Sequence, residues 1–316
     1  MSKNQQKLGL AARAGWLYYV ANNTQDEIAA KLNISRQAAQ RLVSLADAEE
    51  LIQHRLIHPL SECIELIEQL RSRFGFSYCD VAPSDPGQGD LYTSLGVCGA
   101  ACIESYLVSK TPVVLAIGGG RALRATVDRV KPMNTPQHRI VSLHGHMGPD
   151  GRASHFEAAM HLADRVNAEA FLLPTPVVAR TPEERRILQQ QHAFQAVKEL
   201  VKRAKVALVG IGEMAWKGPL HEDGFYADAD VTDLLERGAV GVVLAWAFDR
   251  SGKLIRCSIN ERVAGMPLDL LPPRRVIGVA QGEQKVEAIL GAIRGKIISG
   301  LITDETTARR LLEFKS

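Results

Sequence analysis

The stretch TQDEIAAKLNISRQAAQRL, residues 24–42, decides the fold of the N-terminal part of this chain. Thr24 and Glu27 form the S/T-x-x-E pattern of a capping box, which predicts that a helix begins after Thr24. Asn33 follows this helix, and Asn tolerates the left-handed conformation that a tight turn requires. Ser35 can cap a second helix. The stretch therefore predicts two short helices joined by a tight turn, the helix-turn-helix arrangement.

The apolar residues of this stretch are spaced to fill a small core between two such helices. They are Ile28, Leu32, Ile34 and Leu42, with Ala29 and Ala39 where the two backbones approach closely. The polar residues then face outward, where arginine can pair with guanine or phosphate, glutamine with adenine, and hydroxyls with phosphate. An ordinary amphipathic hairpin fits the same pattern. We predict binding to double-stranded operator DNA through Thr24, Gln25, Ser35, Arg36, Gln37, Gln40, Arg41 and Ser44.

Net charge adds little to the DNA-binding prediction. The chain of 316 residues carries a net charge of +3, and residues 1–58 hold seven Lys/Arg against five Asp/Glu. Affinity for DNA depends strongly on how many phosphates the protein neutralises. With so few basic residues, useful affinity needs two such domains on one site. We therefore expect a homo-oligomer.

The cysteines and the apolar segments indicate the cellular compartment. The five cysteines are odd in number and form no C-x-x-C pair: Cys63, Cys79, Cys98, Cys102 and Cys257. The first residues are polar and lack the apolar segment of a signal peptide. No stretch reaches 18 uninterrupted apolar residues, as a membrane-spanning helix would require. We expect a cytoplasmic protein with reduced thiols, no membrane span and no metal or other cofactor.

From residue 78 onward, short apolar runs alternate with segments of helix length. The runs are 113–117, 139–143, 170–173, 206–211, 240–247 and 275–279, and the helical segments include 89–108, 120–130, 154–167 and 283–294. This alternation is typical of a mainly parallel sheet with helices on both faces. We predict an α/β protein with a helix-turn-helix domain over 1–58 and an effector-binding and oligomerisation domain over 59–316. The amphipathic segment 60–74 could join two protomers or pack on its own domain.

Three of the predicted strand ends carry glycine turns. In open parallel sheets, ligands bind beyond the carboxyl ends of the strands. Backbone N–H groups at a glycine-rich helix start can hold an anion or a polyhydroxyl ligand, and a lysine one turn into a helix can reach back to a bound anion. Taken singly, each turn is more simply structural. Together they predict a pocket lined by Gly118, Gly119, Gly120, Arg121, Gly210, Gly212, Asp249, Gln281 and Lys285.

Other motifs are weaker. Asp249 lies in FDRSG and fits a hairpin turn, although an acid there could also bind hydroxyl groups. The pattern G-x-G-x-x-A beginning at Gly210 has no suitable acid on the next strand, so we discount dinucleotide binding. His144 and His146 have no third ligand nearby, which favours a loop or core pair over a metal site. No phosphate-binding loop and no Ser–His–Asp or Cys–His arrangement is present.

Motifs along nearly the whole chain carry a family resemblance. They are WLYYV (16–20), TQDEIA (24–29), VALVGIG (206–212), GAVG (238–241), FD-x-x-G (248–252), K-x-x-AI (285–289) and LITDE-x-x-A (301–308). On these motifs the chain resembles the SorC/DeoR-type family of bacterial sugar-responsive transcriptional regulators. The resemblance implies an N-terminal helix-turn-helix domain and a C-terminal domain related to sugar-phosphate isomerases. It also implies a tetramer of two dimers, with a sugar or sugar phosphate altering DNA binding.

The chain departs from the family pattern at three positions. Ala122 stands where the family usually has a hydroxyl residue, Val242 where it usually has Asp, and Gln281 where it usually has Gly. The lost hydroxyl removes a phosphate donor and Gln281 adds an amide suited to hydroxyl groups, which favours an unphosphorylated sugar or polyol. Lys285 and the glycine N–H groups keep a phosphorylated effector open.

The sequence thus predicts a DNA-binding regulator of a carbohydrate or polyol catabolic operon, controlled by a sugar, polyol or sugar-phosphate effector. A sugar-phosphate isomerase-like enzyme on the same α/β fold is the alternative. It is disfavoured because the large domain offers no clear general base, with Val242 where an acid might be expected. A DNA-architectural protein without an effector would leave the glycine turns unexplained.

Overall fold

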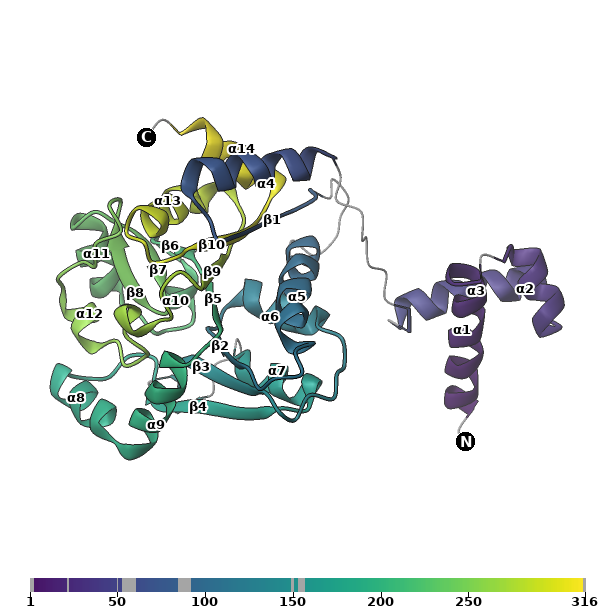
Figure 1. Cartoon of the computed structure of the whole chain (residues 1–316), viewed down its shortest axis with the longest axis horizontal. Helices are drawn as coiled ribbons and strands as arrows, with labels where there is room; N and C mark the ends of the chain where they lie inside the picture. Colours follow the sequence, from purple (N-terminus) through teal and green to yellow (C-terminus); the bar gives the residue numbers. More distant parts are fainter. Residues whose placement is uncertain are drawn as a thin grey trace. The chain divides into compact units, whose positions relative to one another are not determined.

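The structure is a computed structural model that describes residues 3–21, 23–49, 51–52, 61–84, 92–148, 151–152 and 157–314 (Figure 1). Contacts between Cα atoms divide the chain into two compact units, Met1–His58 and Pro59–Ser316. We call them the N-terminal unit and the C-terminal unit. None of the described helices is long and apolar enough to cross a membrane.

The N-terminal unit holds three helices, α1 (Lys3–Tyr19), α2 (Gln25–Leu32) and α3 (Arg36–Ala48). The predicted capping box is present, since the Thr24 hydroxyl accepts from the Glu27 N–H and the Glu27 carboxylate accepts from the Thr24 N–H. Asn33 adopts the left-handed conformation with φ 55° and ψ 48°. The Ser35 hydroxyl caps α3 by accepting from the Ala38 N–H at 3.2 Å. The helix-turn-helix prediction is confirmed at this local level.

A small apolar core joins the three helices. Ile28 and Ala39 are fully buried, as is Ala14 on α1, and Leu32 and Leu42 pack against them. These are residues that the spacing predicted for the core, with α1 as an added third wall. The polar side of α3 is consequently left on the surface.

The C-terminal unit is built on a sheet of seven parallel strands in the order β1-β10-β9-β5-β2-β3-β4. The strands are β1 (Tyr78–Ala82), β2 (Val114–Ile117), β3 (Arg139–Met147), β4 (Glu169–Pro176), β5 (Val206–Gly210), β9 (Val276–Val279) and β10 (Gly300–Asp304). The predicted parallel α/β class is confirmed. Two of these strands, β1 and β10, were not among the predicted runs.

Helices cover both faces of this sheet. One face carries α5 (Thr93–Leu107), α6 (Arg121–Arg129) and α7 (Ala159–Val166). The opposite face carries α4 (Ser61–Phe74), α9 (His192–Lys202), α11 (Asp228–Glu236), α13 (Val286–Arg294) and α14 (Glu305–Glu313). The remaining helices are α8 (Pro182–Gln190), α10 (Pro219–Glu222), α12 (Ser258–Arg262) and the 3₁₀ turns η1 (Leu268–Leu270) and η2 (Glu283–Lys285). Alternation along β2 shows the two faces, because Leu115 and Ile117 join one core while Ala116 joins the other.

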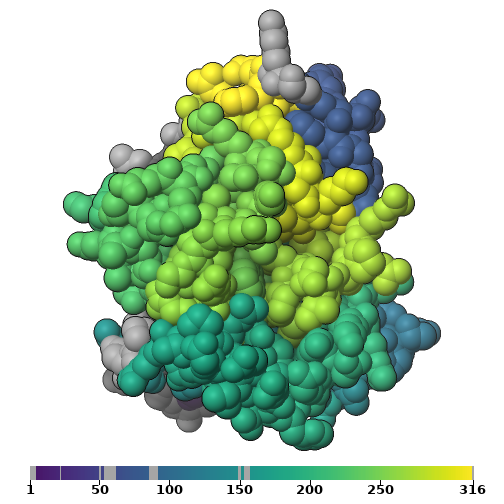
Figure 2. All heavy atoms as spheres, turned by 90° about the vertical axis from the view of Figure 1, so that its left-hand side faces the viewer, coloured from purple at the N-terminus to yellow at the C-terminus, as the bar shows by residue number. Residues whose placement is uncertain are grey.

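The amphipathic helix α4, near the start of the C-terminal unit, packs on that unit. Cys63, Leu66 and Leu70 are buried in the core against β1 and α14. Figure 2 shows α4 in blue against the yellow C-terminal helices, and Arg309 of α14 forms an ion pair with Glu62 of α4 at 2.8 Å. Of the two predicted roles of this segment, packing on its own domain is therefore the one observed.

The run 240–247 is not the single strand that the sequence predicted. It splits into β7 (Ala239–Val243) and β8 (Trp246–Asp249), which pair antiparallel in a second sheet beside the short β6 (Gly212–Glu213). The two turn residues have positive φ, 51° at Leu244 and 67° at Ala245. Two-residue hairpin turns with positive φ usually contain Asn or Gly. The Leu-Ala pair contains neither, so the sequence does not indicate a turn here.

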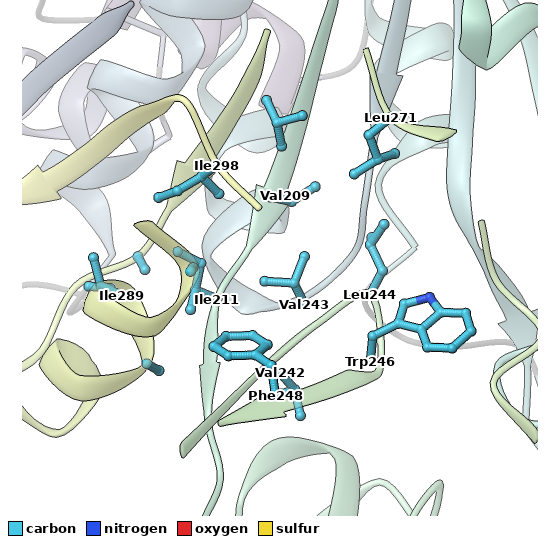
Figure 3. Close-up of a cluster of buried hydrophobic side chains, with 14 of the residues drawn as sticks. Val209, Ile211, Val242, Val243, Leu244, Trp246, Phe248, Leu271, Ile289 and Ile298 are labelled. Carbon is cyan, nitrogen blue, oxygen red and sulfur yellow. The ribbon is translucent and has the colours of Figure 1, made fainter. Parts of the chain in front are cut away.

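Buried contacts hold this hairpin against the main sheet. Figure 3 shows Val243, Leu244, Trp246 and Phe248 among apolar side chains that belong to the core. The Asn260 amide bonds both the N–H and the carbonyl of Ala247, at 2.9 and 2.8 Å. Because these backbone groups are buried, the amide satisfies polar atoms that would otherwise destabilise the fold.

We expect Thr24→Ala to loosen α2. Loss of the capping hydroxyl should lower the free energy of opening this helix by about 1 kcal/mol, whereas Thr24→Ser keeps the hydroxyl and should behave like the parent. Amide hydrogen exchange of Ile28 and Ala29 in the full chain measures this free energy. Equal exchange in the Ala and Ser variants would show that the box does not stabilise the helix.

Candidate functional site

The carboxyl ends of β2, β5 and β9 lie side by side, because these three strands are parallel neighbours in the sheet. After β2 the chain adds strands in one direction, and after β5 it adds them in the other. Such a reversal leaves a crevice between the two strand ends, where open α/β sheets bind their ligands. Here the Gly118 N–H donates to the Leu208 carbonyl at 2.8 Å, and a Cβ on Gly210 would lie 3.2 Å from the Gly119 carbonyl oxygen.

A cavity of about 150 Å³ opens at this crevice. Six of the nine predicted pocket residues line it, namely Gly119, Gly120, Arg121, Gly210, Gly212 and Lys285. The glycine turns after β2 and β5 do converge. Val242, which stands where the resembling family usually has Asp, is also part of the wall.

The three other predicted residues do not line the cavity. Asp249 ends β8, where its carboxylate accepts from the Ser251 N–H, the Ser251 hydroxyl and the Lys253 N–H at 2.9, 2.6 and 3.0 Å. It closes a hairpin turn, the simpler of the two predicted roles. Gln281 is buried after β9 but contributes nothing to the lining. Gly118 lies behind the wall, since a Cβ there would be 2.8 Å from Leu244 Cδ2.

Lys285 is the basic group of the cavity. It ends the turn η2, is only 8% exposed, and places its ammonium 5.9 Å from the centre of the Tyr92 ring. Within the described part of the chain, no carboxylate forms an ion pair with it. A buried ammonium without a counter-ion is costly, and attraction to one aromatic ring recovers only part of that cost. An anion in the cavity would supply the counter-ion that Lys285 lacks.

The start of α6 adds a second attraction for anions. Gly120 is the N-cap residue, has φ 112°, and offers no side chain to cap the helix. The first N–H groups of a helix have no partner within it and carry the positive end of the helix dipole. Gly120 and Arg121 both line the cavity, so this helix start faces the same space as Lys285.

Arg121 itself is engaged elsewhere. Its guanidinium forms an ion pair with Glu222 of α10 at 3.1 Å, and both side chains are about half exposed. Pro219 and Leu220 of α10 line the cavity. The pair therefore joins the start of α6 to the segment that walls the cavity.

His144 and Glu213 are among the lining residues that were not predicted for the pocket. His144 on β3 is partly buried, its Nδ1 lies 2.6 Å from the Gly145 carbonyl, and desolvation lowers the pKa of its imidazole. In the sequence, His144 was noted only as one of two histidines, with His146, that could bind a metal. No group of three His, Cys, Asp or Glu residues able to hold a metal occurs in the described segments. Glu213 directly follows Gly212, so reading one residue past the second glycine turn would have found it.

Comparison with known proteins identifies the family. The family model described as "Putative sugar-binding domain" matches residues 58–313. The erythritol catabolism regulatory protein EryD of Brucella abortus (strain 2308) is 30% identical over 303 residues, covering 96% of this chain and 96% of its own length. The chain belongs to the SorC/DeoR-type family of sugar-binding transcriptional regulators.

Other members of the SorC/DeoR-type family match over the same length. The deoxyribonucleoside regulator of Bacillus subtilis (strain 168) is 28% identical over 98% of this chain and 99% of its own length. The crystal structure of the full-length sorbitol operon regulator SorC from Klebsiella pneumoniae has a TM-score of 0.76 and 27% identity, covering 99% of this chain and 100% of that one. These relatives are named as regulators, so the predicted regulator is confirmed over the predicted enzyme.

The second candidate site of this SorC/DeoR-type chain lies on the N-terminal unit. Of the eight residues predicted to contact DNA, Thr24 and six residues of the second helix and its cap are exposed, and Gln25 is half-buried. The six are Ser35, Arg36, Gln37, Gln40, Arg41 and Ser44. Arg36 lies 3.6 Å from Asp26, with both side chains about 70% exposed. A surface pair of this kind contributes roughly 0–1 kcal/mol, so the guanidinium can exchange partners.

We expect Gly119→Ala to destabilise the C-terminal unit by about 1–3 kcal/mol, the usual cost of overpacking. The added Cβ would sit 1.8 Å from His144 Nε2. Replacing His144 by Ala removes that clash, so the double variant should lose less stability than the two single losses together. Urea unfolding of the four proteins gives the coupling. Strictly additive losses would mean that the two residues do not meet.

Proposed function

We propose that this chain regulates an operon for carbohydrate or polyol catabolism and that a small carbohydrate with one anionic group, such as a sugar or polyol phosphate, controls its DNA binding. The observation that carries the proposal is Lys285, a buried ammonium in the cavity with no carboxylate partner among the described residues. The open helix start at Gly120 supports it, because backbone N–H groups there suit a phosphate. EryD and the sorbitol operon regulator are named for erythritol and sorbitol, which are polyols.

The sequence had favoured an unphosphorylated effector on two grounds, the hydroxyl that Ala122 lacks and the amide of Gln281. The Gln281 ground loses its support, because Gln281 does not line the cavity, whereas Ala122 does line it. An uncharged ligand would leave the Lys285 ammonium without a counter-ion. An anionic ligand supplies one, and charge-assisted hydrogen bonds are stronger than those between neutral groups.

In this proposal the effector acts by shifting populations. It binds one arrangement of the effector domains more tightly and thereby changes the spacing of the DNA-binding helices in the oligomer. The low basic charge of the N-terminal unit supports an oligomer, since two units on one operator combine their affinities. We propose a homotetramer, as the family resemblance implies, working in the cytoplasm where operator DNA is found.

The DNA-binding part is tested by replacing Arg36, Gln37, Gln40 and Arg41 singly with Ala. Each side chain is exposed on α3, so folding and effector binding should not change. Operator affinity should fall, by roughly 1–3 kcal/mol at positions that read bases. Fluorescence anisotropy with promoter DNA at fixed salt measures the loss, and Lys202→Ala on α9 serves as a charge-matched control. Parental affinity in all four variants would refute the assignment of α3 to DNA recognition.

The effector part is tested with Lys285→Met, which keeps the length of the side chain and removes its charge. Calorimetry with polyol phosphates, sugar phosphates and their unphosphorylated forms should show binding of phosphorylated ligands to the parent. Lys285→Met should weaken that binding at least about tenfold, since a hydrogen bond to a charged group contributes about 1.5–3 kcal/mol. Lys296→Met changes an exposed lysine and should have no effect. Tight binding of only the unphosphorylated forms would contradict the proposal.

A further inference from the structure

The cavity holds a carboxylate as well as an ammonium. Glu213 lines it from the end of β6, where its backbone is fixed by pairing with Gly241 of β7. Its Oε2 atom is buried and has no hydrogen-bond partner in the described part of the chain. A buried acceptor left without a donor costs about 1–3 kcal/mol, and more when it is charged. The folded protein therefore carries this cost at a place where a ligand can bind.

Glu213 and Lys285 do not neutralise each other. Strand β6 and turn η2 are in contact, yet no ion pair at 4.0 Å or less joins the two side chains. Each of them lines the cavity. Because the two charged side chains do not pair with each other, each can bind a different group of one ligand. An anionic group suits Lys285, and a hydrogen-bond donor suits Glu213.

The neighbouring donors are already engaged. The Tyr226 hydroxyl donates to the Ala245 carbonyl, and His221 uses one ring nitrogen with Asp228 at 2.8 Å and accepts from the Lys217 N–H at 3.2 Å with the other. Of the other polar lining side chains, Arg121 pairs with Glu222, and Met214, which follows Glu213 in the sequence, is apolar. A ligand can supply the donor that the Glu213 Oε2 atom lacks.

We infer that Glu213 accepts a hydrogen bond from a hydroxyl group of the effector and thereby selects carbohydrates with a single anionic group. This inference rests on the proposed function, which places the effector in the cavity with its anion at Lys285. A hydroxyl donates to the carboxylate, whereas a second phosphate near Glu213 would meet a like charge in a low-dielectric site. Polyol or sugar monophosphates therefore bind, and bisphosphates are rejected.

The selection is tested by calorimetry on the full chain. The probes are tetritol, pentitol and hexitol monophosphates, the matching bisphosphates, and inorganic phosphate. The parent should bind its best monophosphate at least tenfold more tightly than the matching bisphosphate. Glu213→Gln keeps an acceptor but removes the charge, so it should reduce this ratio at least fivefold. Glu213→Ala should weaken monophosphate binding at least tenfold, and Glu236→Gln, an exposed acid on α11, should leave both values unchanged.

A second measurement needs no ligand. If Oε2 is held ready for a hydroxyl, Glu213→Met should raise the thermal midpoint of the ligand-free C-terminal unit by a few degrees, because it replaces an unpartnered acceptor with an apolar group. A structural role for the carboxylate would instead lower the midpoint. A lowered midpoint, or an unchanged monophosphate-to-bisphosphate ratio in Glu213→Gln, overturns the inference.

The two proposals fail in different ways. If neither inorganic phosphate nor any phosphorylated probe binds the parent, the anion site at Lys285 is wrong and the proposed function falls. If phosphorylated probes bind the parent and bind less to Lys285→Met, the proposed function holds. The Glu213 variants then decide the selection by themselves.

Discussion

The close approach of two backbones, at Gly119 after β2 and at Gly210, the last residue of β5, is the constraint on which the site depends. The sheet reverses its strand order between these strands, and the space at their carboxyl ends becomes a cavity only if no side chain fills it. A Cβ at Gly119 would collide with His144, and one at Gly210 would press on the Gly119 carbonyl. Helix α6 begins two residues after Gly119, and strand β6 begins two residues after Gly210. The positions of the two glycines therefore determine where α6 and β6 meet the cavity.

Several residues in the cavity wall adopt conformations or environments that are unfavourable by themselves. Contacts with the rest of the unit keep them there. Leu244 and Ala245 both lie in the left-handed region, which costs roughly 1–2 kcal/mol for each residue with a Cβ. The Tyr226 hydroxyl on the Ala245 carbonyl, the Asn260 amide on Ala247 and the buried Phe248 ring keep the turn in that shape. The Lys285 ammonium without a counter-ion and the Glu213 Oε2 atom without a donor add a cost of desolvation. Stability given up at such positions is typical of binding sites, where the ligand restores what the free protein lacks.

Local patterns in the sequence were enough for the helix pair and for most of the sheet. The Thr24–Glu27 box, the left-handed Asn33 and the strand β5 all follow from residues within a few positions of one another. The hairpin at Leu244 did not, since tertiary packing imposes a backbone conformation that a Leu-Ala pair does not favour. Gln281 lies on the same strand-turn segment as Val279 and Lys285, which line the cavity, but its own side chain is buried outside the lining.

The ion pair between Arg121 and Glu222 has a kinetic consequence. It joins α6 to α10, a helix of only four residues, and both side chains are about half exposed to solvent. An exposed pair contributes roughly 0–1 kcal/mol, so it adds little to the energy of moving α10 away from α6. Loop motions take nanoseconds to microseconds. This ion pair therefore slows the entry and exit of a metabolite very little, and the lifetime of a complex depends on the contacts inside the cavity.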